Sequence, residues 1–159
     1  MITQKLLHTL FEYKDGELLW KIDRHSNKVK GKIVGYFSKT SKKGVRINGK
    51  SYLIHRLIFM MFYGYFPKEV DHIDNNPYNN KIENLREATR IQNQYNIRKP
   101  ITNSSGFKNV SWNKKSQKWG VRIQFNKKAK HIGVFDDIEL ADLVAQEARD
   151  KYHGTFAKH

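Results

Sequence analysis

Hydrophobic and polar positions alternate in the N-terminal part of the chain, and this alternation predicts short strands. The segments ELLWKI, KIVGYF and GVRINGKSYLI mix β-branched and aromatic residues and are separated by glycine-containing breaks. Asn48-Gly49 stands between two such runs, which is typical of a two-residue hairpin turn. Residues 52–66 are strongly apolar, so we expect a strand that continues as a short buried helix ending near Gly64 and Pro67.

The pattern changes after Val70, where polar residues become dense. Asn and Pro crowd the stretch from Asn75 to Asn80, which predicts a loop, and IENLREA after it can pair back as a strand. Thr89 and Gln92 have the spacing of a capping box, so a short helix is expected to begin there. The predicted order is strand, loop, strand, helix.

A second domain is predicted at the C-terminus. Residues 100–106, PITNSSG, have the composition of a linker, and WGVRIQF and KHIGVF then read as two alternating strands. Asp136 and Glu139 predict a capping box for a final helix, whose apolar face comprises Ile138, Ala141, Val144, Ala145, Ala148 and Tyr152. We therefore expect an α+β protein with domains at residues 1–100 and 101–159.

The chain is strongly basic, and the charge is uneven. It carries 30 Lys and Arg against 15 Asp and Glu, a formal net charge of +15. Residues 1–70 hold 14 basic against 5 acidic residues and residues 101–135 hold 8 against 0, whereas residues 71–100 hold 5 against 4. A surface rich in Lys and Arg attracts polyanions and releases their counterions, so nucleic acid is the expected partner.

Several other classes of protein are excluded by composition. No apolar run is long enough to span a bilayer, and no anchor motif is present, so we expect no membrane partner and a cytoplasmic location. The absence of cysteine excludes disulfides and thiolate zinc sites. Any metal must therefore be bound by nitrogen and oxygen ligands.

Four polar residues of the strand, loop, strand, helix segment could converge on one point. Asp71 and the amide oxygen of Asn93 are hard donors that favour Mg²⁺ or Mn²⁺ over Zn²⁺. His72 can take a proton from water, and the side chain or backbone of Asn84 could hold one nitrogen of its ring. Neighbours in a strand point to opposite faces, so this hypothesis requires a bend or a strand end at Asp71 and His72.

The same stretch, DHIDNNPYNNKIENLREATRIQN, resembles the catalytic motif of the HNH nucleases, in particular the homing endonucleases of phages. YLIHRLIF also resembles the segment that precedes this motif. The resemblance implies a phage-encoded DNA endonuclease acting in a bacterial host, with a ββα-metal core at about residues 68–98 and hydrolysis products bearing 5′-phosphate and 3′-hydroxyl ends. It also implies that His72 is the general base, that Asp71 and Asn93 bind one divalent metal ion, and that Asn84 orients the base. Asn stands where the family name has its last His, and Asn96 is an alternative ligand.

The C-terminal segment, residues 105–156, resembles the ethylene-response-factor type of DNA-binding domain. That family packs a three-stranded antiparallel sheet on one helix and lays the exposed face of the sheet in the major groove of duplex DNA. The resemblance implies DNA contacts from Lys108, Ser111, Asn113, Arg122, Gln124 and His131. Ser111, Asn113 and His131 replace the Arg or Trp common in the family, so the recognised sequence does not follow from it.

Some roles have alternatives. Arg86 either clamps a DNA phosphate or pairs with Glu83 or Glu87, and His55 is expected to be a packed, hydrogen-bonded histidine. Core roles are expected for Trp112 and Trp119. The protein as a whole could instead be a non-catalytic DNA-binding regulator or an RNA-binding protein attracted by charge alone. An asymmetric pair of DNA-binding parts predicts a monomer.

Overall fold

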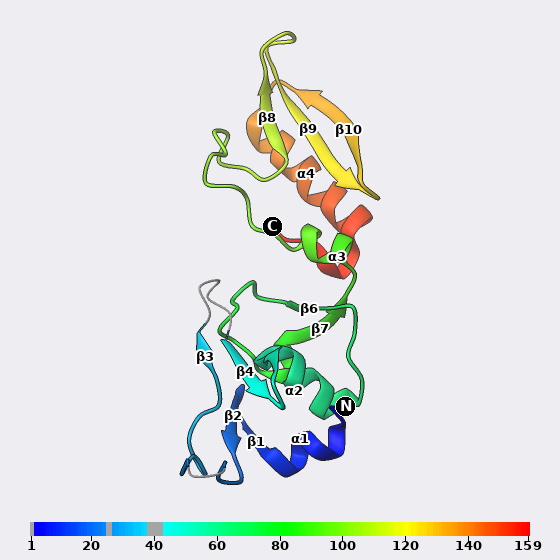
Figure 1. The fold of residues 1–159 in the computed structure, drawn as a ribbon. Coiled ribbons are helices and arrows are strands. Elements are labelled where there is room, and N and C mark those ends of the chain that lie inside the picture. The colour runs from blue at the N-terminus through cyan, green and yellow to red at the C-terminus, as the bar shows by residue number, and fades with distance from the viewer. Residues whose placement is uncertain (1, 25–26, 38–42) are drawn as a thin grey trace. The chain divides into compact units, whose positions relative to one another are not determined.

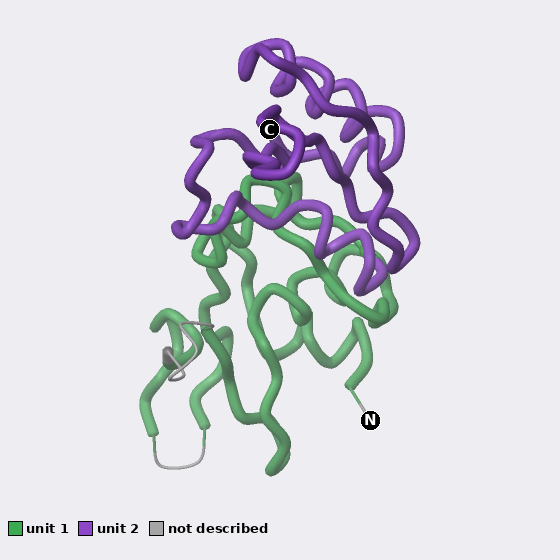
Figure 2. The backbone as a smooth tube through the Cα atoms, turned by 90° about the horizontal axis from the view of Figure 1, so that it is seen from above, with its two compact units in different colours: residues 1–88 green, residues 89–159 purple. Residues whose placement is uncertain are grey.

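The computed structural model describes residues 2–24, 27–37 and 43–159, and they form a mixed α+β fold, as the sequence predicts. The chain divides into two compact units, residues 1–88 and 89–159 (Figure 2). Among the described residues, no helix has the length and apolar character that a bilayer-spanning segment needs.

The described residues of the first unit form two helices, one 3₁₀ turn and small antiparallel sheets (Figure 1). In chain order its elements are α1 (Gln4–Leu10), β1 (Phe11–Lys14), β2 (Glu17–Trp20), β3 (Tyr36–Phe37), β4 (Lys43–Ile47), β5 (Lys50–Leu53), α2 (Ile54–Tyr63), β6 (Glu69–His72), η1 (Ile82–Asn84) and β7 (Leu85–Ala88). The strands pair as β1-β2, β3-β4-β5 and β6-β7.

Helix α2 is the centre of the first unit. Its buried residues include Ile54, Leu57 and Ile58, each with no exposed surface, and they share one apolar core with residues of α1, β1, β2 and β4. Val70 of β6 and Leu85 of β7 join the same core, so burial of these side chains fixes the β6-β7 pair on the helix. The pair carries Asp71 and His72 of the predicted site, and Asn84 lies in η1 directly before β7.

Several local predictions in this unit are confirmed. Asn48 and Gly49 have φ of 47° and 78° and join β4 to β5, as in a type I′ hairpin turn. The strand β5 leads directly into α2, and Gly64 ends that helix in the left-handed conformation, with its N–H donating to the carbonyl of Met60. The helix α1 was not predicted. It is short, and its capping residue Thr3 accepts from the N–H of Leu6 without a capping-box partner.

The second unit contains α3 (Arg90–Tyr95), β8 (Val110–Asn113), β9 (Lys118–Phe125), β10 (Lys128–Phe135), α4 (Ile138–His153) and η2 (Gly154–Phe156). The three strands form an antiparallel sheet in the order β10-β9-β8, and α4 packs across one face (Figure 1). Val110, Val121, Ala141 and Ala145 form the buried core between sheet and helix, which Trp119 and Ile138 partly cover.

Two sequence expectations differ from this unit. Asp137, and not Asp136, caps α4 by accepting from the N–H of Leu140, while Asp136 pairs with Lys118 at 2.9 Å. The division of the chain falls after Ala88, whereas the linker composition placed it at residue 100. Helix α3 belongs to the second unit because the Tyr95 ring stacks on His153, with centroids 3.8 Å apart.

Candidate active site

The β6-β7 pair positions the first two candidate residues. Asp71 lies opposite Arg86 and His72 lies opposite Leu85 in the antiparallel register. The strand β6 ends at His72, so the strand end that the hypothesis requires is present. Asp71 is 4% exposed, whereas His72 is only partly buried and thus remains accessible to solvent.

Arg86 binds Asp71, a partner that the sequence did not suggest. Its Nε and Nη2 atoms lie 2.8 and 2.7 Å from Oδ2 of Asp71. Charge-assisted bonds of this kind are strong, and they compensate the cost of burying the carboxylate. The carboxylate is thereby held in a fixed position beside His72. Arg86 thus forms an ion pair across the strands with Asp71, in addition to the alternatives expected from the sequence.

The imidazole of His72 is held by Asn80, which the sequence did not single out. Oδ1 of Asn80 accepts a hydrogen bond from Nε2 of His72 at 2.9 Å, and Asn80 is only 3% exposed. With Nε2 as the donor, the neutral ring carries its lone pair on Nδ1, the nitrogen that can accept a proton. His55 of α2 packs its ring edge-on at 5.0 Å, a buried position that confirms the expectation of a packed histidine.

Asn84 acts on the loop between the two strands. Its Nδ2 donates to Oδ1 of Asp74 at 2.9 Å and to the carbonyl of Asn79 at 2.8 Å, and its Oδ1 accepts from the N–H of Asp74 at 3.0 Å. The Asn84 side chain thus bonds to the loop that presents Asn80, and Asn80 makes the hydrogen bond to Nε2 of His72. Asn84 therefore supports the imidazole indirectly, through the loop that contains Asn80.

Asp74 accepts, through its carboxylate, several of the hydrogen bonds that hold this loop. Besides the Asn84 contacts, its carboxylate accepts from the N–H of Asn76 and from Nδ2 of Asn79, each at 2.7 Å. Partial burial acts to raise the pKa of Asp74, but these hydrogen bonds and the nearby His72 outweigh it and lower the pKa below 3.8. The density of Asn in the loop is thus explained by hydrogen bonding to one carboxylate.

The β1-β2 hairpin holds the end of the loop from outside. The Tyr13 hydroxyl accepts from the N–H of Ile82 at 3.1 Å, and Asp15 pairs with Lys81 at 2.8 Å. Gly16 has φ of +88°, and a Cβ there would lie 3.0 Å from the Lys81 nitrogen and 3.2 Å from the Asn80 carbonyl carbon. The hairpin therefore packs backbone to backbone against the residue that holds His72.

Asn93 lies on α3, in the second unit, whereas Asp71, His72 and Asn84 belong to the first. The predicted capping box is confirmed, since Thr89 and Gln92 exchange both hydrogen bonds and thereby start α3. Asn93 is partly buried. The alternative ligand, Asn96, is 2% exposed, so its amide is far less accessible than that of Asn93.

The candidate side chains supply only part of the ligands that a hard cation needs. Within the described ranges, no three His, Cys, Asp or Glu side chains gather as a metal-binding cluster. Asp71 nevertheless supplies an oriented carboxylate, and ions such as Mg²⁺ often bind one or two protein oxygens together with water and substrate phosphate. The donor chemistry thus suits Mg²⁺ or Mn²⁺ and not a closed zinc site.

The exposed face of the β8-β9-β10 sheet carries most of the predicted DNA contacts. Four of these side chains line one polar hollow of about 410 Å³ together with Trp112, Lys114, Lys115 and Gly120; the four are Ser111, Asn113, Arg122 and His131. Gln124 is exposed further along β9. Trp112 is 42% exposed and stands edge-on to Trp119 at 4.9 Å, so its expected core role is wrong.

Lys108 does not share this surface. Its Nζ donates to the carbonyls of Tyr95 and Lys158 at 3.1 and 3.0 Å. Burial, followed by the charges of Arg149 and Lys158, lowers its pKa to about 8. The ammonium thus serves internal contacts, and Lys108 is not placed to read bases with the sheet.

Comparison with known proteins defines the class. Residues 52–95, which span β5 to α3 and hold all four candidate residues, match the HNH endonuclease family. The chain is also 34% identical over 95 residues to Protein 3.8 of Escherichia phage T7, a match that covers 60% of this chain and 75% of that protein. Residues 52–95 therefore form an HNH endonuclease domain, and the chain belongs to one family with this phage protein. No solved structure matches the chain.

Proposed function

We propose that this protein is a metal-dependent endonuclease that hydrolyses a phosphodiester bond of duplex DNA. The observation that carries the proposal is the His72 imidazole at the end of β6, hydrogen-bonded through Nε2 to buried Asn80 and adjacent in sequence to the oriented carboxylate of Asp71. An imidazole fixed in this tautomer can accept a proton from an attacking water at Nδ1.

The chemical step follows from these groups. Water loses a proton to Nδ1 of His72 as its oxygen attacks phosphorus, and the bond from phosphorus to the 3′ oxygen of the neighbouring nucleotide breaks. The leaving 3′ oxygen takes a proton from solvent water, so the products are a 5′-phosphate and a 3′-hydroxyl. We assign Asp71 and Asn93 as the protein ligands of one Mg²⁺ or Mn²⁺ ion, which when bound would stabilise the charge that develops on the phosphate and the leaving oxygen.

The second unit is proposed as the DNA-reading module, of the ethylene-response-factor type. Its sheet exposes Arg122, Gln124 and His131 on the face that α4 leaves uncovered. A small antiparallel sheet fits the major groove, and Arg and Gln side chains there can bind guanine and adenine edges. We propose a homing-type role for the whole protein. We also propose that Arg86 does not contact DNA and affects the substrate only by holding the carboxylate of Asp71.

The test separates chemistry from binding. His72→Ala should abolish cleavage of supercoiled plasmid in Mg²⁺ or Mn²⁺, while its affinity for DNA stays within a few-fold of that of the parent. His131→Ala is the matched control, because removing this histidine should weaken binding but leave cleavage at saturating protein. Cleavage by His72→Ala at the parent rate would contradict the assignment of the base. A parent protein that binds plasmid and leaves it intact would indicate a regulator instead.

A further inference from the structure

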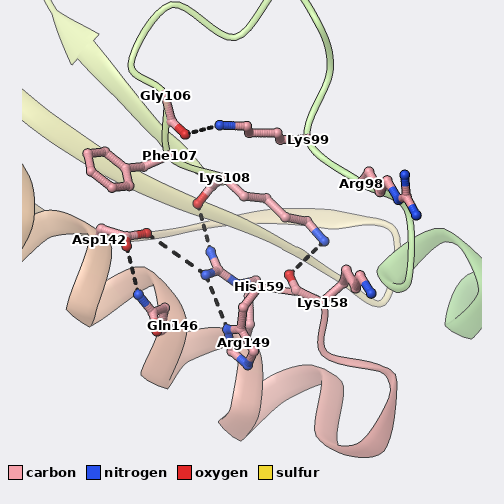
Figure 3. Close-up of a pocket in the computed structure, with 10 residues that line it drawn as sticks. All are labelled: Arg98, Lys99, Gly106, Phe107, Lys108, Asp142, Gln146, Arg149, Lys158 and His159. Carbon is pink, nitrogen blue, oxygen red and sulfur yellow. Dashed lines mark hydrogen bonds and ion pairs between the residues drawn. The ribbon is translucent and has the colours of Figure 1, made fainter. Parts of the chain in front are cut away.

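A hollow of about 480 Å³ opens in the second unit, away from the exposed face of the sheet (Figure 3). Figure 3 shows its side chains gathered between α4 and the segments that precede β8 and follow η2. They are Arg98, Lys99, Gly106, Phe107, Lys108, Asp142, Gln146, Arg149, Lys158 and His159. Of the residues that the resemblance assigns to DNA contact, only Lys108 lines this hollow.

The charge of the lining is strongly unbalanced. Five of the lining side chains are Lys or Arg, and a single one, Asp142, is a carboxylate. Asp142 already accepts from Nε2 of Gln146 at 2.7 Å and lies 4.0 Å from Arg149, at the limit of an ion pair. The fixed charges of the hollow therefore favour an anion.

Arg149 is the unusual member, because this charged residue is only 1% exposed. Its Nη1 donates to the carbonyl of Lys108 at 2.7 Å, and its Nη2 lies 3.3 Å from Nδ1 of His159 (Figure 3). Its Nε is buried and finds no acceptor among the described residues. A buried cation with only a distant carboxylate is costly, and a bound anion in the hollow would reduce that cost.

The position of Lys108 is a second, independent indication that the hollow favours an anion. Its Nζ donates to two carbonyls at the wall of the hollow, and these bonds hold the ammonium near Arg149 and Lys158. The lowered pKa of Lys108, to about 8, reflects burial first and these two like charges next. A negative charge placed among the three would relieve their repulsion.

We propose that this hollow is a phosphate-binding site and that it takes a backbone phosphate of the DNA bound by the second unit. Guanidinium and ammonium groups are the ligands that proteins use for phosphate. The volume lies in the range of small-ligand sites, which leaves room for a phosphate with part of its sugar. The choice of DNA as the source rests on the proposed function, whereas the phosphate site does not.

The first experiment uses inorganic phosphate and the full-length protein. Phosphate is titrated against chloride at constant ionic strength, and backbone amide shifts are followed by NMR. Residues 98, 99, 106–108, 149 and 158 should shift and saturate. Lys158→Gln should weaken this binding several-fold, whereas Lys127→Gln, the same change of charge at an exposed turn outside the hollow, should leave it unchanged. Shifts that do not saturate, or that are equal in the two variants, would overturn the site.

The second experiment identifies the source of the phosphate. The salt dependence of duplex binding is measured on a His72→Ala background, which separates binding from cleavage. Loss of one phosphate contact should reduce the slope of log K against log salt by about one in Lys158→Gln and not in Lys127→Gln. Equal slopes together with saturable phosphate binding would overturn DNA as the source and assign the site to a small phosphorylated molecule. Absence of cleavage by the parent protein would contradict only the proposed function and not the phosphate site.

Discussion

At the scale of single residues, the main feature is the hydrogen bond between His72 and Asn80. Asn80 is buried and accepts from one ring nitrogen, so it sets both the tautomer and the angle of the imidazole. The sequence indicated His72 and Asp71 through their spacing, but it gave no means of choosing Asn80 among the asparagines of the loop. That choice depends on how the chain turns between β6 and η1.

We predict that Asn80→Ala lowers kcat by about tenfold or more with little change in KM, because the imidazole loses the acceptor that orients it. Asn80→Asp keeps an acceptor oxygen and should restore much of the activity. The readouts are kcat, KM and the pH dependence of kcat. Tyr78→Phe, at an exposed position of the same loop, should behave as the parent. Equal activity of Asn80→Ala and Tyr78→Phe would contradict the positioning role.

A second prediction concerns Arg86. Arg86→Gln should lower the free energy of unfolding by about 2 kcal/mol, because a nearly buried carboxylate loses its guanidinium; the value is below that for a fully buried pair since Arg86 is partly exposed. Urea denaturation measures the change. Adding Asp71→Asn should recover part of the loss, as expected for coupled neighbours. Strict additivity of the two substitutions would show that the pair contributes nothing.

At the scale of elements, predictions succeeded where a few neighbouring residues determine the conformation. The Asn48-Gly49 turn, the capping box of Thr89 and the end of α2 at Gly64 are all local backbone requirements. They failed where a distant contact decides. Tyr95 assigns α3 to the second unit by stacking on His153, and no local signal precedes that contact in the sequence. For the same reason the support of Asn80 by the β1-β2 hairpin was not foreseen.

The hairpin contact gives a prediction at this scale. Gly16→Ala should destabilise the protein by about 1 kcal/mol or more and reduce cleavage, because the new Cβ meets the backbone of Asn80 and Lys81. Gly49→Ala is the matched control. Its φ of +78° imposes similar backbone strain, but its Cβ meets nothing within 4 Å. Thermal melts and cleavage rates of the two variants separate strain from contact. If both lose activity equally, the contact has no catalytic effect.

At the scale of the whole molecule, charge and chemistry are divided along the chain. The sequence has basic flanks around a nearly neutral centre. It did not reveal how far cations are also used inside the fold, as in the buried guanidinium of Arg149. Periodicity assigns charged residues to the surface by default, and only packing identifies the exceptions.

Stability should depend on pH through His153, the last residue of α4. Its Nε2 donates to the carbonyl of Gln124 at 2.8 Å, and its buried Nδ1 finds no partner in the described part of the chain. Burial lowers the pKa of His153 below 6.5, the Gln124 bond opposes this, and the charges of Lys108 and Arg149 add to it. The unfolded chain therefore binds the proton more readily, so the free energy of unfolding should fall as pH decreases below about 6.5.

Urea denaturation at a series of pH values measures this dependence. His153→Phe, which can still stack on Tyr95, should lose about 1 kcal/mol at neutral pH through the missing hydrogen bond, and its stability should decline less steeply with acid. A parent and a variant with parallel pH profiles would assign the acid sensitivity to other groups.

The contact of Gly16 with the peptide groups of Asn80 and Lys81 bears on how small a working nuclease can be made from this chain. A fragment of residues 52–95 would contain the whole HNH motif. It would lack the β1-β2 hairpin that contacts the loop holding His72, and it would lack the residues that bury α2. A minimal fragment should therefore begin before Thr3, so that it includes α1 and the β1-β2 hairpin together with the candidate site.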